Sequence, residues 1–328
     1  RRSVWIIGGD GWAYDIGFGG VDHALASGRD VNILVLDTEV YSNTGGQNSD
    51  SSIMPGGFDM NQYGQYHQGK LTERKEVAQI LAAGHGSPFV ACVSIANSAK
   101  FYQAVLDGLL YRGSAFLQAY TPCQPEHGIG DDRSASQTKM ARDCRAMPEF
   151  TFDPKMGEME SECFDLKGNP LTGRDWMTKK DENGEVYNYP PVQWAATEGR
   201  FRKHFLKIKD PATQERISLE EIILRIGQQD INDRNFLNLQ HRSYIPEHGV
   251  YVDLVDKVGK KRRMAISRMM VLFVVERRRN WRRLQGRAGI ANKDYQAQQK
   301  MLASVDNGET ELSALLKDTK EVYQQFFA

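Results

Sequence analysis

The sequence predicts an α/β fold, with a doubly wound, mostly parallel sheet followed by a helical C-terminal extension. In the first half of the 328 residues, short apolar runs alternate with segments of helical periodicity. That alternation is typical of a parallel sheet covered by helices. Near residue 150 the composition changes, and helical patterns return further on. Because the length also suits two domains, we place a first domain at 1–150 and the extension at 151–328.

Local signals in the first half support each expected element. The run 31–36 is apolar except for Asn32, as expected of a buried parallel strand. Gly28 is a suitable left-handed stop for the first helix, and Thr72 a suitable cap for the second. The predicted strands are 4–7, 31–36, 89–95 and 115–120, and the predicted helices are 13–27, 73–83 and 99–110.

The second half begins with a stretch rich in Gly, Pro, Asp and Lys, over 151–193. Its turn signals, Lys167-Gly168-Asn169-Pro170 and Glu182-Asn183-Gly184, predict loops and hairpins without a core layer. Beyond it, the predicted helices are 194–208, 219–226, 268–284 and 309–327.

The segment from Arg262 to Arg287 is dense in arginine. We interpret it as a solvated helix face whose arginine stems cover apolar surface. The alternative is a docking face for an acidic partner.

Overall charge and hydropathy exclude several classes of partner. Lys plus Arg equals Asp plus Glu, 42 against 42, so nothing indicates binding to nucleic acid or to an anionic membrane. No apolar run reaches the roughly 18–20 residues of a membrane span. The chain opens at Arg1-Arg2 without an initiator Met or an apolar signal region. We therefore expect a cytoplasmic protein and a piece of a longer polypeptide.

The cysteines are expected to be reduced thiols, because none forms a C-x-x-C pair and the chain is too long for a disulfide scaffold. Cys92 lies within an apolar run and reads as a buried core thiol. Structural roles are expected for two others, Cys144 and Cys163.

The informative stretch combines two strand ends. Gly9-Asp10-Gly11 follows the first predicted strand, and the segment 37–44 follows the second. In a βαβ unit both turns lie at the carboxyl edge of neighbouring strands, where open α/β sheets bind ligands. The Asp10 carboxylate, the Thr38 hydroxyl and the Val40 carbonyl are oxygen ligands of the kind that Mg²⁺ prefers.

The helix that begins at Gly11-Trp12-Ala13 suits a diphosphate, because its free N–H groups and dipole attract anions. Gly9 and Gly11 allow close approach of the backbone. A G-D-G by itself is common in turns. Together with the following Asn43-Thr44-Gly45-Gly46-Gln47 it predicts a metal-bridged diphosphate site, although the residues do not identify which diphosphate.

Residues 9–47 read GDGWAYDIGFGGVDHALASGRDVNILVLDTEVYSNTGGQ. This stretch is similar, almost word for word, to the thiamine-diphosphate motif of the pyruvate:ferredoxin (flavodoxin) oxidoreductase family. The resemblance covers roughly 4–130, including Thr121-Pro122-Cys123 and His127-Gly128. Beyond about 150 it is looser and resembles the C-terminal extension of long family members.

The resemblance implies roles for particular residues. Asp10, Thr38 and Val40 would hold Mg²⁺, and Asn43 would lie beside the thiazolium and substrate as the catalytic candidate. Cys123 would be one ligand of a [4Fe-4S] cluster, whose other ligands lie outside this chain. The spacing between Cys123 and His127 departs from the family's, so His127 receives no role. The diphosphate would be lined by Gly9, Gly11, Trp12 and Ser42.

The resemblance also implies the activity, which is oxidative decarboxylation of a 2-oxo acid, by family default pyruvate, to acyl-CoA and CO2. Electrons would pass through [4Fe-4S] clusters to ferredoxin or flavodoxin. Coenzyme A, upstream domains of the same polypeptide and a second copy in a homodimer are the other expected partners. The fragment alone is expected to be inactive.

Two alternatives stay open. One is a non-redox thiamine-diphosphate decarboxylase or synthase, which would not need Cys123. The other is a non-catalytic scaffold, against which Asp10, Thr38 and Asn43 count. Glu39 is expected to be a salt-bridge partner or to lie behind the metal ligands. The glycine-bearing loop 56–69 could serve as a lid or as a plain surface loop.

Overall fold

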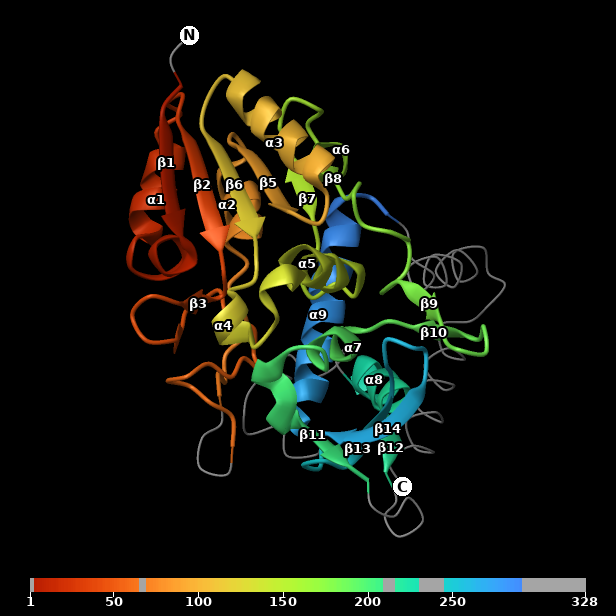
Figure 1. Cartoon of the computed structure of the whole chain (residues 1–328). Helices are drawn as coiled ribbons and strands as arrows, with labels where there is room; N and C mark the ends of the chain where they lie inside the picture. Colours follow the sequence, from red (N-terminus) through yellow and green to blue (C-terminus); the bar gives the residue numbers. More distant parts are fainter. Residues whose placement is uncertain (1–2, 65–68, 209–215, 230–244, 291–328) are drawn as a thin grey trace, which may run out of the picture.

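The computed structural model describes residues 3–64, 69–208, 216–229 and 245–290. Its larger sheet has the strand order β1-β2-β6-β5-β7-β8 (Figure 1). The first four are parallel, as predicted, and β7 and β8 are antiparallel additions. The bounds of these parallel strands are β1 Trp5–Gly9, β2 Asn32–Asp37, β5 Phe89–Ser94 and β6 Ala115–Tyr120.

Helices cover both faces of this sheet, which confirms the doubly wound fold. Side chains alternate along each strand. On β2, Ile33 and Val35 therefore pack with α1 (Phe18–Ala26) and α2 (Val77–His85). On the opposite face, Ala91 of β5 and Leu117 of β6 pack with Ala104 of α3 (Ser98–Leu110).

The first two helices differ from their predicted bounds. The expected helix 13–27 opens with a π-helical turn, Gly11–Ile16, and α1 follows after Gly17. Gly28 has a positive φ of 64°, as predicted for a helix stop. The second helix begins at Val77, so the predicted cap Thr72 is wrong. Its expected first turn is not helical, and there the buried side chain of Arg74 reaches the carboxylate of Asp37.

The sheet continues beyond residue 150, where only loops and hairpins were expected. β7 (Phe150–Phe152) and β8 (Phe164–Asp165) bury their phenylalanine rings in the same core as α1 and α2. The predicted hairpin at Glu182-Asn183-Gly184 is confirmed, and it joins β9 (Thr178–Lys180) to β10 (Val186–Asn188). The division of the chain into two domains at residue 150 stays a prediction. The helices α4 (Gln124–His127) and α5 (Ser134–Asp143) precede β7, and α6 (Glu160–Cys163) precedes β8.

The predicted helix 194–208 is wrong. A short helix, α7 (Pro191–Ala195), a 3₁₀ turn (Gly199–His204) and strand β11 (Phe205–Lys207) occupy this segment. The helix α7 ends at Ala195, and beyond it Gly199 packs backbone to backbone on Gly128, its N–H donating to the Gly128 carbonyl at 3.2 Å. Sequence periodicity cannot reveal such a long-range contact.

The extension also contains a second sheet that the sequence did not predict. Its strand order is β11-β14-β13-β12, with β12 Ile217–Ser218, β13 Val250–Val255 and β14 Lys261–Ile266. The predicted helices at 219–226 and 268–284 are confirmed as α8 (Leu219–Gln229) and α9 (Arg268–Arg287). The predicted helix 309–327 lies outside the described residues.

Helix α9 runs through the middle of the molecule, between the two sheets (Figure 1). Its first half is buried, and the fully buried Arg277 forms an ion pair with Glu76 at 2.7 Å. The expectation of a solvated arginine-rich face is therefore wrong for Arg277, whereas Arg283 is exposed and Arg278, Arg279, Arg282 and Arg287 are half-buried. Within the described part of the chain, no helix has both the length and the apolar character of a membrane span.

Candidate functional site

The two predicted turns meet at the carboxyl edge of the larger sheet. β1 and β2 pair in parallel with Gly9 opposite Leu36, so Asp10 and Thr38 leave neighbouring strands at the same end. One Asp10 oxygen, Oδ1, accepts hydrogen bonds from the Thr38 hydroxyl at 3.0 Å and from the Thr38 N–H at 3.3 Å. Asp10 is only 2% exposed. The structure thus brings the two side chains together as predicted.

The turn after β2 adds a third oxygen. The Thr38 hydroxyl lies 3.3 Å from the Val40 carbonyl and 3.5 Å from the Ser42 hydroxyl. This compact turn requires a left-handed backbone at Glu39, with φ 63°, a conformation that residues other than glycine seldom adopt. As a result the Glu39 side chain lies in the buried interior, while the Thr38 hydroxyl contacts both Asp10 and the Val40 carbonyl.

Two serines that the sequence reasoning missed complete the surroundings of Asp10. Its second oxygen, Oδ2, accepts hydrogen bonds from Ser49 at 2.7 Å and from Ser51 at 2.6 Å. The run Ser49-Asp50-Ser51-Ser52, which follows Gln47-Asn48 after the glycine pair, was the available signal. It became informative only when the chain folded back onto the first strand.

A buried lysine supports this serine segment. The Lys70 ammonium donates to the carbonyls of Ser49 at 3.0 Å, Asp50 at 3.1 Å and Ser52 at 2.7 Å. Burial lowers the pKa of Lys70 to about 8, and the nearby Arg74 acts in the same direction. The loop that positions the donors to Asp10 therefore depends on a desolvated cation.

The start of the first helix is fixed by Tyr41. Its hydroxyl donates to the Gly11 carbonyl at 3.0 Å and to Asp15 Oδ2 at 2.8 Å. Burial and this hydrogen bond to Asp15 raise the pKa of Tyr41 to about 12. A Cβ at Gly11 would overlap the Tyr41 ring. A Cβ at Gly8 or at Gly17 would likewise overlap the ring of Trp12.

The remaining predicted residues lie around this edge. Ser42 is half-buried and Asn43 is exposed, on the loop that leads to Gly46. Cys123 is a free, half-buried thiol just past β6, the strand next to β2. Among the described residues, no group of His, Cys, Asp and Glu is arranged to hold a metal ion. The metal and cluster roles of these residues therefore remain proposals.

The other three thiols belong to the protein interior. Cys144 and Cys163 are buried, and burial raises the pKa of each. Cys92 donates to the Pro148 carbonyl at 3.5 Å, and burial raises its pKa as well. These environments favour the protonated thiol over the thiolate that binds metals.

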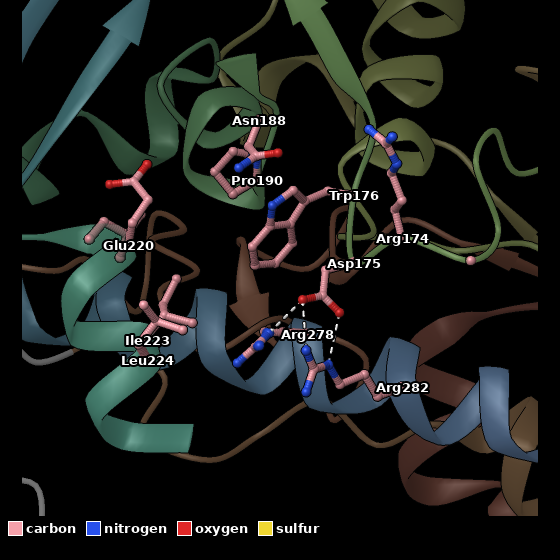
Figure 2. Close-up of a pocket in the computed structure, with 12 residues that line it drawn as sticks. Arg174, Asp175, Trp176, Asn188, Pro190, Glu220, Ile223, Leu224, Arg278 and Arg282 are labelled. Carbon is pink, nitrogen blue, oxygen red and sulfur yellow. Dashed lines mark hydrogen bonds and ion pairs between the residues drawn. The ribbon is translucent and has the colours of Figure 1, made fainter. Parts of the chain in front are cut away.

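A separate cavity of about 440 Å³ lies between the loop 173–176, α8 and α9 (Figure 2). Asp175 accepts hydrogen bonds there from Arg278 and Arg282, each at 2.8 Å, while Trp176 and Ile223 supply apolar wall. This cavity shares no lining residue with the Asp10–Thr38 edge.

Comparisons with known proteins identify a family model and several relatives that match part of this chain. Residues 1–119 match the family described as thiamine pyrophosphate enzyme, C-terminal TPP binding domain. The chain is 39% identical over 180 residues to a pyruvate:ferredoxin oxidoreductase of Moorella thermoacetica. This alignment covers 54% of this chain and 15% of the relative. It is 35% identical over 236 residues to a pyruvate-flavodoxin oxidoreductase of Rhodospirillum rubrum, covering 71% and 17%.

A pyruvate-flavodoxin oxidoreductase of Klebsiella pneumoniae is 45% identical over 143 residues, covering 43% of this chain and 12% of the relative. The chain thus spans only a small part of the length of these relatives. Among solved structures, a 2-oxoglutarate:ferredoxin oxidoreductase from Magnetococcus marinus aligns with a TM-score of 0.32 and 16% identity, over 42% of this chain and 44% of that one. Residues 1–119 therefore match the C-terminal TPP binding domain of thiamine pyrophosphate enzymes, and about half of the chain or more is similar to pyruvate:ferredoxin and pyruvate-flavodoxin oxidoreductases.

Proposed function

We propose that this chain supplies the magnesium–thiamine diphosphate site of an oxidoreductase that converts pyruvate and coenzyme A into acetyl-CoA and CO2. The two electrons released would pass through [4Fe-4S] clusters to ferredoxin or flavodoxin. The observation that carries the proposal is the meeting of Asp10, Thr38 and Val40 at one sheet edge, inside a domain of the TPP-binding family. The names of the homologues support the substrate and the acceptors.

The residues present fit a magnesium-bridged diphosphate. A buried carboxylate, a hydroxyl and a backbone carbonyl form an all-oxygen donor set around the Thr38 hydroxyl, which is the chemistry that Mg²⁺ prefers. In the proposal Asp10, Thr38 and Val40 hold the metal and Asn43 faces the substrate. The diphosphate is lined by Gly9, Gly11, Trp12 and Ser42.

Thiamine diphosphate, when bound, supplies the nucleophilic carbon and the electron sink that cleavage of a 2-oxo acid requires. Asp10 and Thr38 would not touch the bond that breaks. Their contribution is positional, because Asp10 and Thr38 would fix the cofactor through its metal and so fix the distance to the substrate. The four hydrogen bonds that Asp10 accepts limit its movement before any ligand arrives.

Cys123 is the proposed cluster ligand in this chain. It lies at the same sheet edge, since Thr121 N donates to the Asp37 carbonyl at 3.0 Å just before it. A [4Fe-4S] cluster needs four thiolates, and the environments of Cys92, Cys144 and Cys163 favour the thiol form. The other ligands would come from upstream domains of the same polypeptide, in a cytoplasmic homodimer.

The first experiment tests the metal–diphosphate site in the complete protein. We expect Asp10→Ala to abolish binding of thiamine diphosphate with Mg²⁺, measured by calorimetry, because it removes the only carboxylate of the proposed donor set. Asp22→Ala is the matched control. Asp22 lies on α1 and pairs with His85 at 2.8 Å, so its loss should leave the affinity unchanged. Unchanged affinity in Asp10→Ala would refute the assignment.

A second experiment separates redox from non-redox chemistry. Iron analysis of Cys123→Ser, with Cys163→Ser as control, should show iron loss only in the first. Under anaerobic conditions, a viologen dye should be reduced when pyruvate and coenzyme A are both present, and assays with other 2-oxo acids should show pyruvate as the best substrate. Release of CO2 without dye reduction, in a protein free of iron, would instead indicate a non-redox decarboxylase.

A further inference from the structure

The carboxylate of Glu39 connects the proposed metal turn to the C-terminal extension. Glu39 stands between the two candidate ligands Thr38 and Val40, and it is completely buried. Its Oε2 lies 2.6 Å from Arg200 Nη2, and both side chains are inaccessible to solvent. Arg200 belongs to the 3₁₀ turn Gly199–His204, outside the matched domain at 1–119. Arg200, a residue of the extension, therefore forms an ion pair with Glu39, the residue between the two candidate ligands.

The guanidinium of Arg200 is itself held on several sides. Its Nε donates to Glu198 Oε2 at 2.7 Å. Its central carbon lies 4.4 Å from the ring centroid of Phe201, 5.3 Å from that of Phe58 and 5.6 Å from that of Trp194. A planar guanidinium can pair with two carboxylates and stack on aromatic rings at the same time. The position of the Arg200 guanidinium is therefore fixed by packing against these rings as well as by its ion pairs.

Charge balance supports a fixed ion-pair network. Burial opposes the charged form of Arg200, but the pairing with Glu198 and Glu39 outweighs it and raises the pKa of Arg200. Burial would likewise raise the pKa of Glu198, yet Arg200 and His127 keep it below its ordinary value. Arg74 adds a second cation, 4.0 Å from the other oxygen of Glu39.

The backbone of the turn is held from the same side. His127 is fully buried and its Nε2 lies 3.1 Å from the Thr38 carbonyl, an acceptor, so this nitrogen carries a proton. His127 Nδ1 lies 3.7 Å from Glu198. The Gly128–Gly199 backbone contact brings these two segments together. Glu39, His127, Glu198 and Arg200 form one buried cluster. Within it, Arg200 contacts the side chain of Glu39 and His127 contacts the main chain of Thr38.

We propose that Arg200 is a positioning residue for the metal ligands. Through Glu39 it holds the left-handed turn in which the Thr38 hydroxyl contacts both Asp10 and the Val40 carbonyl. The C-terminal extension would then be part of the cofactor site, since it supplies the support behind the ligands. This inference rests on the proposed function, because it needs Mg²⁺ at that turn.

The test is a titration of Mg²⁺ into the complete protein saturated with thiamine diphosphate. Loss of a partner behind metal ligands typically costs about 10–100-fold in metal affinity, and we expect Arg200→Ala to fall in that range. Arg200→Lys keeps the charge but cannot hold both carboxylates, so its affinity should lie between those of Arg200→Ala and the parent. Thermal unfolding of each variant shows which of them fold.

The matched control is Arg263→Ala. Arg263 also pairs with a carboxylate, Asp253 at 2.8 Å, but it does so on the β13–β14 hairpin, and its loss should leave Mg²⁺ affinity unchanged. If Asp10→Ala abolishes binding while folded Arg200→Ala binds Mg²⁺ like the parent, the inference about Arg200 fails alone. If Arg200→Ala does not fold, unchanged affinity in Arg200→Lys has the same meaning. If Asp10→Ala binds normally, the proposed site fails and this inference fails with it.

Discussion

The buried ammonium of Lys70 makes a prediction about stability as a function of pH. Its pKa is lowered to about 8 in the folded chain, whereas an unfolded lysine titrates near about 10.4. The unfolded chain therefore binds more protons between these two values. It follows that the free energy of unfolding should rise with pH across this window, because the cost of burying the charge disappears as Lys70 loses its proton.

The magnitude follows from the difference between the two pKa values. Each pKa unit corresponds to about 1.36 kcal/mol, so the contribution of Lys70 should grow by roughly 2–3 kcal/mol between about pH 7 and pH 10. No discount for solvent screening is needed, since Lys70 is only 7% exposed. Below about pH 8 the full cost of the buried charge is present.

The assay is urea unfolding of the chain and of Lys70→Met at a series of pH values from about 7 to 10. Tyrosines and other titrating groups are common to both proteins, so the difference between the two free energies isolates Lys70. From about pH 7 to pH 10, we expect the free energy of unfolding of the parent protein to rise by roughly 2–3 kcal/mol relative to that of Lys70→Met. A difference that stays constant with pH would refute the argument that Lys70 is a desolvated cation supporting the serine loop.

Further predictions concern the neighbours of Asp10 and the helix start. Ser51→Ala should cost about 1.5–3 kcal/mol of unfolding free energy, the range for a hydrogen bond to a charged group, and should weaken Mg²⁺ binding in calorimetry; an unchanged urea midpoint would contradict it. Gly11→Ala should lower both the melting temperature and cofactor affinity, because its Cβ would overlap the Tyr41 ring. Gly19→Ala is the matched control, because a Cβ at this position of α1 would meet no atom within 4 Å. It should raise the free energy of unfolding by up to about 1 kcal/mol, since alanine has the higher helix propensity. A lower stability of Gly19→Ala would contradict this reasoning.

The sequence was sufficient to predict the parallel sheet and the meeting of Asp10 with Thr38. Both follow from local rules, since a βαβ unit places successive strand ends at one edge whatever the rest of the chain does. Ser49 and Ser51 could not be predicted in the same way. Their hydrogen bonds to Asp10 exist because the loop after Gly46 turns back toward the first strand and is held there by Lys70.

The periodicity of apolar residues and the turn signals decided which segments of the first half became strands and helices, because these depend on neighbours in the chain. Tertiary contacts decided the rest. The residues just before α2 are not helical where Arg74 reaches Asp37, and the predicted helix 194–208 does not form where the backbones of Gly199 and Gly128 touch. The pairing of Arg200 with Glu39 likewise joins residues far apart in sequence. A buried charge must find its counter-charge wherever the fold provides one, and no local pattern encodes that partner.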